Sequence, residues 1–160
     1  PMANPADTKM QLIGVFDQKW LRPMAETLKR LGTKSAWIVH GDDGLDEITL
    51  ATTTQIVELR HGDITERTIS PHDFDLPYCE PEDLKGGDAN YNAEALMDVL
   101  KGADNAYSDI VCANTAAILY LSGNAEDLKT GVQKAKTALK QGDALKILNR
   151  YISITNSAKA

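Results

Sequence analysis

Hydrophobic and polar residues follow two different periods along the first forty positions. Residues 11–16 (QLIGVF) and 35–40 (SAWIVH) are short apolar runs of the length typical of buried strands. Between them, apolar side chains recur every three to four residues, which predicts a helix that ends at Gly32. Pro23 either kinks this helix or marks its start near Arg22. A strand, a helix and a second apolar strand form a βαβ unit, in which the strands are parallel and covered by helices.

The next pattern is that of a hairpin followed by a long loop. Residues 54–70 alternate in polarity on both sides of the sequence HGD, which predicts a β-hairpin with Gly62 at its turn. Prolines punctuate residues 71–88, and this connection is longer than usual. We therefore expect it to contain a short turn and to wrap a surface of the domain.

The rest of the chain carries a helical period. We expect helices capped by Asp88 and Asn105, a third that begins at Asn124, and a short fourth over residues 143–152. The helix over residues 106–121 is apolar nearly all round, which is typical of a buried central helix.

These elements predict an α/β fold in which a mostly parallel β-sheet is flanked by helices, with a β-hairpin and a helical C-terminal half. Residues 1–152 would form one partial α/β domain, and residues 153–160 a polar tail. Two strands and a hairpin make a thin sheet, and parallel strands need partners on both sides. We therefore expect the sequence to be the C-terminal part of a larger fold.

Composition narrows the classes of function. The 160 residues are 42% hydrophobic and 25% charged, as in ordinary globular domains. The net charge is -6 and no basic stripe is visible, so nucleic acid is not expected as a partner. No apolar run approaches the ~20 residues of a membrane helix, and no signal peptide is present, so we expect no membrane partner and a cytoplasmic location. Cys79 and Cys112 form no CxxC motif, which argues against a metal site or a disulfide framework.

Four carboxylates crowd the sequence HGDDGLDEI, directly after the second predicted strand. They are Asp42, Asp43, Asp46 and Glu47. Ligands of open α/β sheets bind beyond the carboxyl ends of the strands, and carboxylates suit Mg²⁺, which often bridges to a substrate phosphate. Either a turn at Gly44 lets Asp46 and Glu47 share one ion, or each serves a different ion. From charge alone, a solvated acidic turn is the simpler interpretation.

Six sequence blocks carry a family resemblance. In order, they are PMANPA (1–6), QLIGVFD (11–17), RPMAETLKRLG (22–32), VHGDDGLDEI (39–48), LKGGDANYNAEAL (84–96) and NTAAILYLSG (114–123). Together they closely resemble the C-terminal part of anthranilate phosphoribosyltransferase, over nearly the whole chain to about residue 152. The sequence HGDDGLDE is the most specific of these elements.

The resemblance implies the fold of the phosphoribosyltransferase and nucleoside phosphorylase class. It also implies a Mg²⁺-dependent enzyme of tryptophan biosynthesis, which transfers phosphoribosyl from 5-phosphoribosyl pyrophosphate to the amine of anthranilate. The family holds its Mg²⁺ partly with an Asp-Glu pair, which matches Asp46 and Glu47 here. Loss of pyrophosphate creates a strongly anionic leaving group, whose charge metal ions neutralise. With this resemblance, the four carboxylates are interpreted as a metal-binding loop.

Other parts of the family pattern lie upstream of the matching blocks and are not in this chain. They are the glycine-rich loop that cradles pyrophosphate, a helical N-terminal domain and an anthranilate-binding arginine. Pro1 matches the second residue of the family's Gly-Pro turn beside anthranilate, so it is a candidate substrate-binding residue. We therefore expect a fragment with no catalytic residue of its own, inactive alone, whose partners are the missing N-terminal half and a second copy in a homodimer.

Three alternatives remain. A pyrimidine nucleoside phosphorylase would share the architecture but is not expected to carry DDGLDE, and a non-catalytic relative that binds nucleic acid should be basic on one face. The chain could also be a stable folding unit without activity. Two polar residues near the acidic loop are interpreted as structural: His40 would bond the loop, and Asn114 would bond a backbone group from within its apolar helix.

Overall fold

The computed structural model describes residues 6 and 8–157, and its four strands form one sheet in the order β1-β2-β3-β4. The strands are β1 (Met10–Gly14), β2 (Ser35–Gly41), β3 (Thr54–Arg60) and β4 (Asp63–Ile69). The β1–β2 pair is parallel, and the β2–β3 and β3–β4 pairs are antiparallel. The prediction of a mostly parallel sheet is therefore wrong for the described strands, which form a mixed sheet. The chain returns from β2 to β3 through a loop without a crossover helix, so β3 runs antiparallel.

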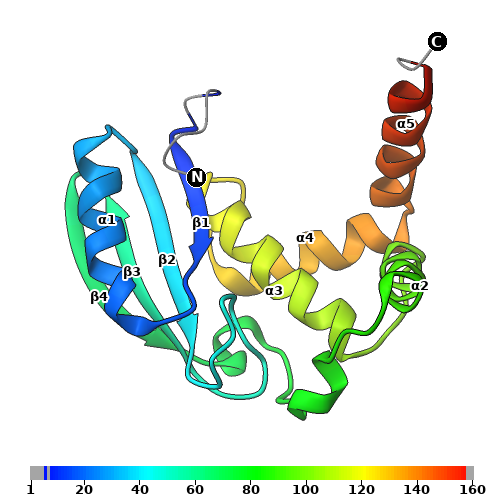
Figure 1. Ribbon diagram of the computed structural model, residues 1–160, viewed down its shortest axis with the longest axis horizontal. Helices are drawn as coiled ribbons and strands as arrows, with labels where there is room; N and C mark the ends of the chain where they lie inside the picture. The colour runs from blue at the N-terminus through cyan, green and yellow to red at the C-terminus, as the bar shows by residue number, and fades with distance from the viewer. Residues whose placement is uncertain (1–5, 7, 158–160) are drawn as a thin grey trace.

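The predicted βαβ unit is confirmed. A 3-10 helix, η1 (Gln18–Trp20), is capped by Asp17 and leads into α1 (Leu21–Arg30). Because α1 begins at Leu21, Pro23 lies in the first helical turn, where its missing N–H is not needed. The helix covers one face of the sheet (Figure 1), and its buried side chains pack on those of β2 and β3.

The predicted hairpin is confirmed as well. His61 and Gly62 have φ angles of 52° and 89°, and two successive positive φ values are those of a type I′ turn. The long connection after the hairpin contains two single turns of 3-10 helix, η2 (Pro71–Phe74) and η3 (Pro81–Leu84).

Four α-helices make up the C-terminal half. They are α2 (Ala89–Leu100), α3 (Ala106–Leu121), α4 (Leu128–Lys140) and α5 (Asp143–Ser157). Asp88 and Asn105 cap α2 and α3 as predicted. The cap of α4 is Asp127, whose carboxylate accepts the N–H of Thr130, and not Asn124. Helix α5 extends beyond the predicted end at residue 152, through residue 157.

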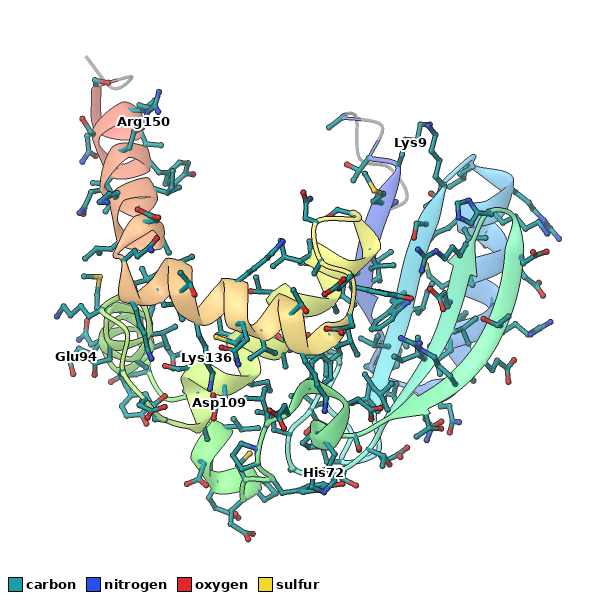
Figure 2. The ribbon with its side chains drawn as sticks, turned by 180° about the vertical axis from the view of Figure 1, so that it is seen from behind. Lys9, His72, Glu94, Asp109, Lys136 and Arg150 are labelled. Carbon is teal, nitrogen blue, oxygen red and sulfur yellow. The ribbon has the colours of Figure 1, made fainter. Side chains whose placement is uncertain are left out.

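Helix α3 covers the other face of the sheet, α4 packs against α3, and side chains of both helices belong to the larger hydrophobic core. The two helices approach closely at Gly131, where an added Cβ would lie 2.8 Å from the Cα of Ala116. Lys136 of α4 pairs with Asp109 of α3 at 2.8 Å, and the two side chains lie between the helices (Figure 2). Hydrogen bonding to Asp109 raises the pKa of Lys136 above its ordinary value, so the lysine is protonated at neutral pH.

Two apolar surfaces lack a packing partner among the described residues. A hollow of about 510 Å³ lies between β1 and α3, where Met10 and Ile118 are half exposed. Helix α5 rises away from the sheet (Figure 1), has no buried residue and exposes Ile147, Tyr151 and Ile154. Both features match the expectation of a fold that needs further partners, because unpaired strand edges and apolar helix faces favour association.

The isolated chain should self-associate through the surface between β1 and α3. Size-exclusion chromatography with light scattering should find dimers or larger species. Ile118→Lys should shift the chain toward the monomer, because it places a charge on that apolar surface. Leu31→Lys is the matched control, since Leu31 is 54% exposed and Ile118 53%. A wild-type chain that is monomeric at all concentrations would contradict this prediction.

Candidate metal-binding site

The acidic loop follows the carboxyl end of β2 and lies against the carboxyl end of β1. Its backbone makes a tight turn, in which the N–H groups of Gly41 and Gly44 bond to the carbonyls of Leu45 and Gly41, both at 2.8 Å. Gly44 has a φ of 92°, a conformation that glycine adopts without strain. The turn expected at Gly44 is therefore present, and the loop occupies the edge of the sheet where ligands of α/β folds bind.

Two of the four carboxylates are used inside the loop itself. Asp43 accepts the hydroxyl of Thr49 at 2.6 Å. Asp42 accepts the side-chain amide of Gln55 at 2.9 Å and also the hydroxyl of Thr53. These bonds tie the start of the loop to its end and to β3, so both side chains have a structural role.

The other two carboxylates, those of Asp46 and Glu47, are exposed and make no hydrogen bond or ion pair within the described residues. Partial burial, and then the negative charge of Asp46, raise the pKa of the Glu47 carboxyl above its ordinary value. A cation would relieve this repulsion. The structure thus separates the acidic cluster into two structural carboxylates and one adjacent pair that is free to bind.

The backbone beside this pair is held on both sides. A Cβ on Gly14, at the end of β1, would overlap the carbonyl oxygen of Asp46, so only glycine fits there. On the other side, the side-chain amide of Asn114 bonds to both the N–H and the carbonyl of Ile48, each at 3.1 Å. The backbone partner predicted for Asn114 is confirmed. Sequence reasoning missed Gly14, and its place within the apolar run of residues 11–16 was the signal that could have identified it, because a glycine inside a strand pattern often marks a close backbone approach.

Two other candidate residues have different outcomes. The Nδ1 atom of His40 lies 2.7 Å from the carbonyl oxygen of Val15, so His40 joins the segment after β1 to β2. The prediction that it bonds the acidic loop is wrong, because the ring points across the strand pair. Pro1, the candidate substrate-binding residue, lies outside the described residues.

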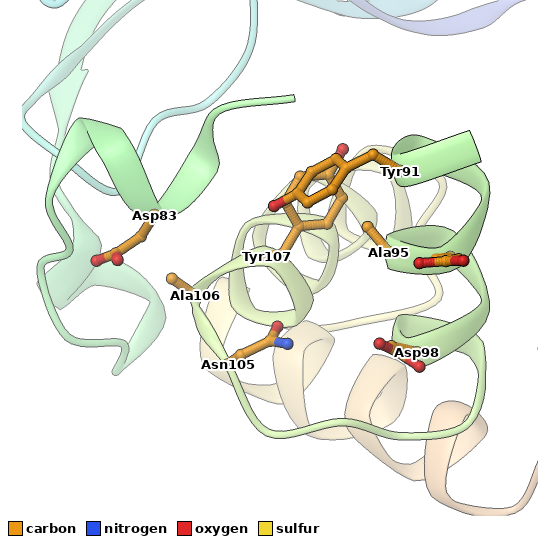
Figure 3. A pocket seen from close by; sticks show the side chains of 8 residues that line it. Asp83, Tyr91, Ala95, Asp98, Asn105, Ala106 and Tyr107 are labelled. Carbon is orange, nitrogen blue, oxygen red and sulfur yellow. The ribbon is translucent and has the colours of Figure 1, made fainter. Parts of the chain in front are cut away.

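A second acidic hollow lies apart from this loop in the sequence. It has a volume of about 420 Å³ and is lined by Asp83 of η3, by Tyr91 and Asp98 of α2, and by Asn105 and Tyr107 around the start of α3 (Figure 3).

None of the helices in the described part of the chain is long and apolar enough to cross a membrane.

Comparison with known proteins identifies the domain. The family described as "Glycosyl transferase family, a/b domain" matches residues 1–145. The chain belongs to this family. The anthranilate phosphoribosyltransferase of Azospirillum brasilense is 48% identical over 158 residues, which cover 99% of this chain and 44% of that protein.

Solved structures agree with this glycosyl transferase assignment. The anthranilate phosphoribosyltransferase of Thermus thermophilus superimposes with a TM-score of 0.79 and 36% identity, covering 88% of this chain and 41% of that one. The enzyme of Saccharomyces cerevisiae in complex with PRPP and Mg gives a TM-score of 0.84 and 25% identity, covering 93% and 43%. The resemblance to anthranilate phosphoribosyltransferases is thus confirmed, and the chain spans about half the length of the curated relatives it matches.

The residues of this glycosyl transferase domain fit Mg²⁺. Among residues 6 and 8–157, no group of three or more His, Cys, Asp or Glu side chains could hold a metal ion, so no closed protein cage is present. Mg²⁺ does not need one, since it keeps several waters and is held by one or two carboxylates together with substrate phosphates. The exposed pair of Asp46 and Glu47 offers this kind of partial site.

Replacing Glu47 by Gln should stabilise the chain at neutral pH when Mg²⁺ is absent. The raised pKa means that the folded state disfavours the ionised carboxyl, so its unfavourable effect grows as the pH rises through the folded pKa. Below the ordinary glutamate pKa of about 4.3, both states are protonated and the gain should vanish. Thermal unfolding from pH 4 to 8 measures this difference.

The same unfolding experiment includes a control variant and is repeated in the presence of Mg²⁺. Glu126→Gln changes an exposed glutamate between α3 and α4 and should have little effect. Mg²⁺ should raise the unfolding midpoint of the wild type more than that of Glu47→Gln. A Gln variant that is less stable than the wild type at pH 8 without metal would show that the folded state does not disfavour the ionised Glu47 carboxylate.

Proposed function

We propose that this chain supplies the Mg²⁺-binding half of an anthranilate phosphoribosyltransferase, which transfers phosphoribosyl from 5-phosphoribosyl pyrophosphate to anthranilate. The observation that carries the proposal is the division of the acidic loop. Asp42 and Asp43 are engaged in internal hydrogen bonds, whereas the adjacent pair of Asp46 and Glu47 is exposed and unpaired within the described residues. A solvated acidic turn would need no such separation of roles.

Each part of the loop has a task in this function. Bound Mg²⁺ supplies charge neutralisation for the departing pyrophosphate. Asp46 and Glu47 would hold the ion, and their exposure would leave it accessible to water and to the substrate phosphates. The bonds of Asp42 and Asp43 keep the loop folded, so that the two binding carboxylates project from a fixed backbone.

The proposal extends to the partners of the chain. The remaining substrate contacts would come from the segment that the full-length relatives carry and this chain does not span; the two together are called the completed enzyme below. That segment would continue the sheet at the edge of β1, which makes the whole sheet mostly parallel, and Pro1 would lie beside anthranilate. We further propose that the completed enzyme is a homodimer. We also propose that it acts in the cytoplasm, because Cys79 and Cys112 are both free thiols and a reducing compartment keeps thiols reduced.

The rival functions have less support. A pyrimidine nucleoside phosphorylase does not explain the DDGLDE loop, and the relative in Azospirillum brasilense at 48% identity is an anthranilate phosphoribosyltransferase. A nucleic-acid-binding relative needs a basic surface, whereas this chain has a net charge of -6.

Changing Asp46 and Glu47 together to Ala in the completed enzyme should lower turnover on the order of a hundredfold or more and weaken its Mg²⁺ dependence, because the ion loses its protein ligands. Anthranilate fluorescence follows the reaction. Asp63→Ala, at the hairpin turn, is the control for loss of one exposed carboxylate. Unchanged turnover of the double variant at limiting Mg²⁺ would reject the assignment.

The 160-residue chain alone should show no transfer to anthranilate. The glycine-rich loop that supplies N–H groups to pyrophosphate in the family lies outside the six matching blocks, and Asp46 and Glu47 cannot replace those donors. Adding the complementary segment as a separate chain should give a 1:1 complex with restored turnover. Turnover by the chain alone, purified from a host that lacks its own enzyme, would contradict the proposal that the complementary segment supplies the remaining substrate contacts.

A further inference from the structure

The side chain of Asn114 is bonded to the residue that directly follows the candidate metal ligands. Its Oδ1 atom accepts the N–H of Ile48, and its Nδ2 atom donates to the carbonyl of Ile48, both at 3.1 Å. Nδ2 also donates to the carbonyl of Ile110, one turn earlier in α3, at 3.0 Å. One amide thus satisfies both backbone groups of Ile48, across 66 positions of sequence.

An asparagine at this position is not explained by the packing of α3. The helix is apolar nearly all round, and its neighbouring alanines at 113, 116 and 117 are completely buried. A polar side chain in such a helix costs free energy unless it is hydrogen-bonded, and an apolar residue of the same size would pack without that cost. The structure therefore indicates that the amide is present for its bonds to the loop.

The opposite side of the pair is fixed by β1. Because Gly14 has no side chain, the backbone of β1 can lie directly against the carbonyl of Asp46. Asp46 is thus held against the sheet and Ile48 against the central helix, with Glu47 between them. The side chain of Ile48 is also fully buried, so its packing in the core holds the backbone at Ile48 in addition to the two hydrogen bonds from Asn114.

We propose that Asn114 is a positioning residue that orders the backbone of Asp46 and Glu47 before Mg²⁺ binds, an inference that rests on the proposed function. Two like charges on adjacent residues repel, and a mobile loop would let them separate. A loop fixed at both ends keeps the two carboxylates near one ion, so less conformational entropy is lost when the metal binds. Partners that orient metal ligands in this indirect way have large effects on metal affinity.

The test compares Asn114→Leu, which has a similar volume and no polar group, with Ser108→Ala in the same helix. Ser108 is buried, and its hydroxyl has no partner among the described residues, so it controls for disturbance of α3. In the completed enzyme, Asn114→Leu should raise the Mg²⁺ concentration for half-maximal rate by about 10–100-fold, with kcat at saturating Mg²⁺ within about threefold of the wild type. Ser108→Ala should match the wild type in both.

Calorimetric titration with Mg²⁺ alone gives a readout that does not depend on turnover. It should show the same loss of affinity for Asn114→Leu. Wild-type affinity in this variant, or a lowered kcat with unchanged Mg²⁺ dependence, would overturn the positioning role. If the wild-type enzyme instead transfers nothing to anthranilate, the proposed function fails, while the Mg²⁺ titration still decides the role of Asn114.

Amide hydrogen exchange of the wild type covers the case in which Asn114→Leu does not fold. The N–H of Ile48 should be protected to the same degree with and without Mg²⁺, because its bond to Asn114 exists before the ion arrives. Exchange of Ile48 at the rate of an open loop in metal-free protein, with protection only after Mg²⁺ is added, would overturn the inference.

Discussion

The hydrogen bonds between Asn114 and Ile48 fix the acidic loop to the central helix, and the arrangement of the candidate site depends on them. The loop leaves β2 at Gly41 and must return to β3 while it carries four negative charges. Two of these carboxylates, those of Asp42 and Asp43, accept hydrogen bonds from the side-chain amide of Gln55 in β3 and from the hydroxyl of Thr49 in the loop. The remaining two are left exposed on a backbone that helix α3 and strand β1 hold in place.

This constraint connects the fold to the chemistry. Helix α3 can reach the loop because it packs against the sheet on one side and α4 on the other, with Gly131 allowing close helix contact. The same helix exposes Ile118 beside the free edge of β1, where the described residues leave an apolar hollow. The chain therefore holds the candidate metal ligands and the uncovered apolar surface on the same helix and strand. This arrangement fits a domain that spans about half the length of its relatives.

Local patterns were enough to predict most of the elements. Apolar runs gave β1 and β2, the HGD turn gave the hairpin, and cap residues gave the starts of α2 and α3. The direction of β3 was not predictable from these patterns, because alternation of polarity does not specify which neighbour a strand joins. The start of α4 was misplaced because Asn124 and Asp127 both have side chains suited to capping, and only the folded chain shows that Asp127 is used.

The sequence indicated which residues are candidate metal ligands, but it did not indicate how the acidic loop is organised internally. The sequence pattern indicated a cluster of four carboxylates, and the family resemblance selected Asp46 and Glu47 among them. That Asp42 and Asp43 have structural partners depends on Thr49 and Gln55, which reach them only after the loop and β3 have folded. The contact between Gly14 and Asp46 likewise joins residues distant in sequence, and pattern analysis along the chain cannot detect it.

The most direct test of the account is to locate the metal with Mn²⁺, which shares the preference of Mg²⁺ for oxygen ligands and broadens nearby nuclear resonances. Isotope-labelled completed enzyme would be titrated with Mn²⁺ in the presence of 5-phosphoribosyl pyrophosphate. The account predicts that the amide resonances of residues 45–48 broaden first, and that Asp46→Ala with Glu47→Ala removes this effect. Broadening that begins instead at the hollow lined by Asp83, Tyr91 and Asp98, with residues 45–48 unaffected, would contradict it.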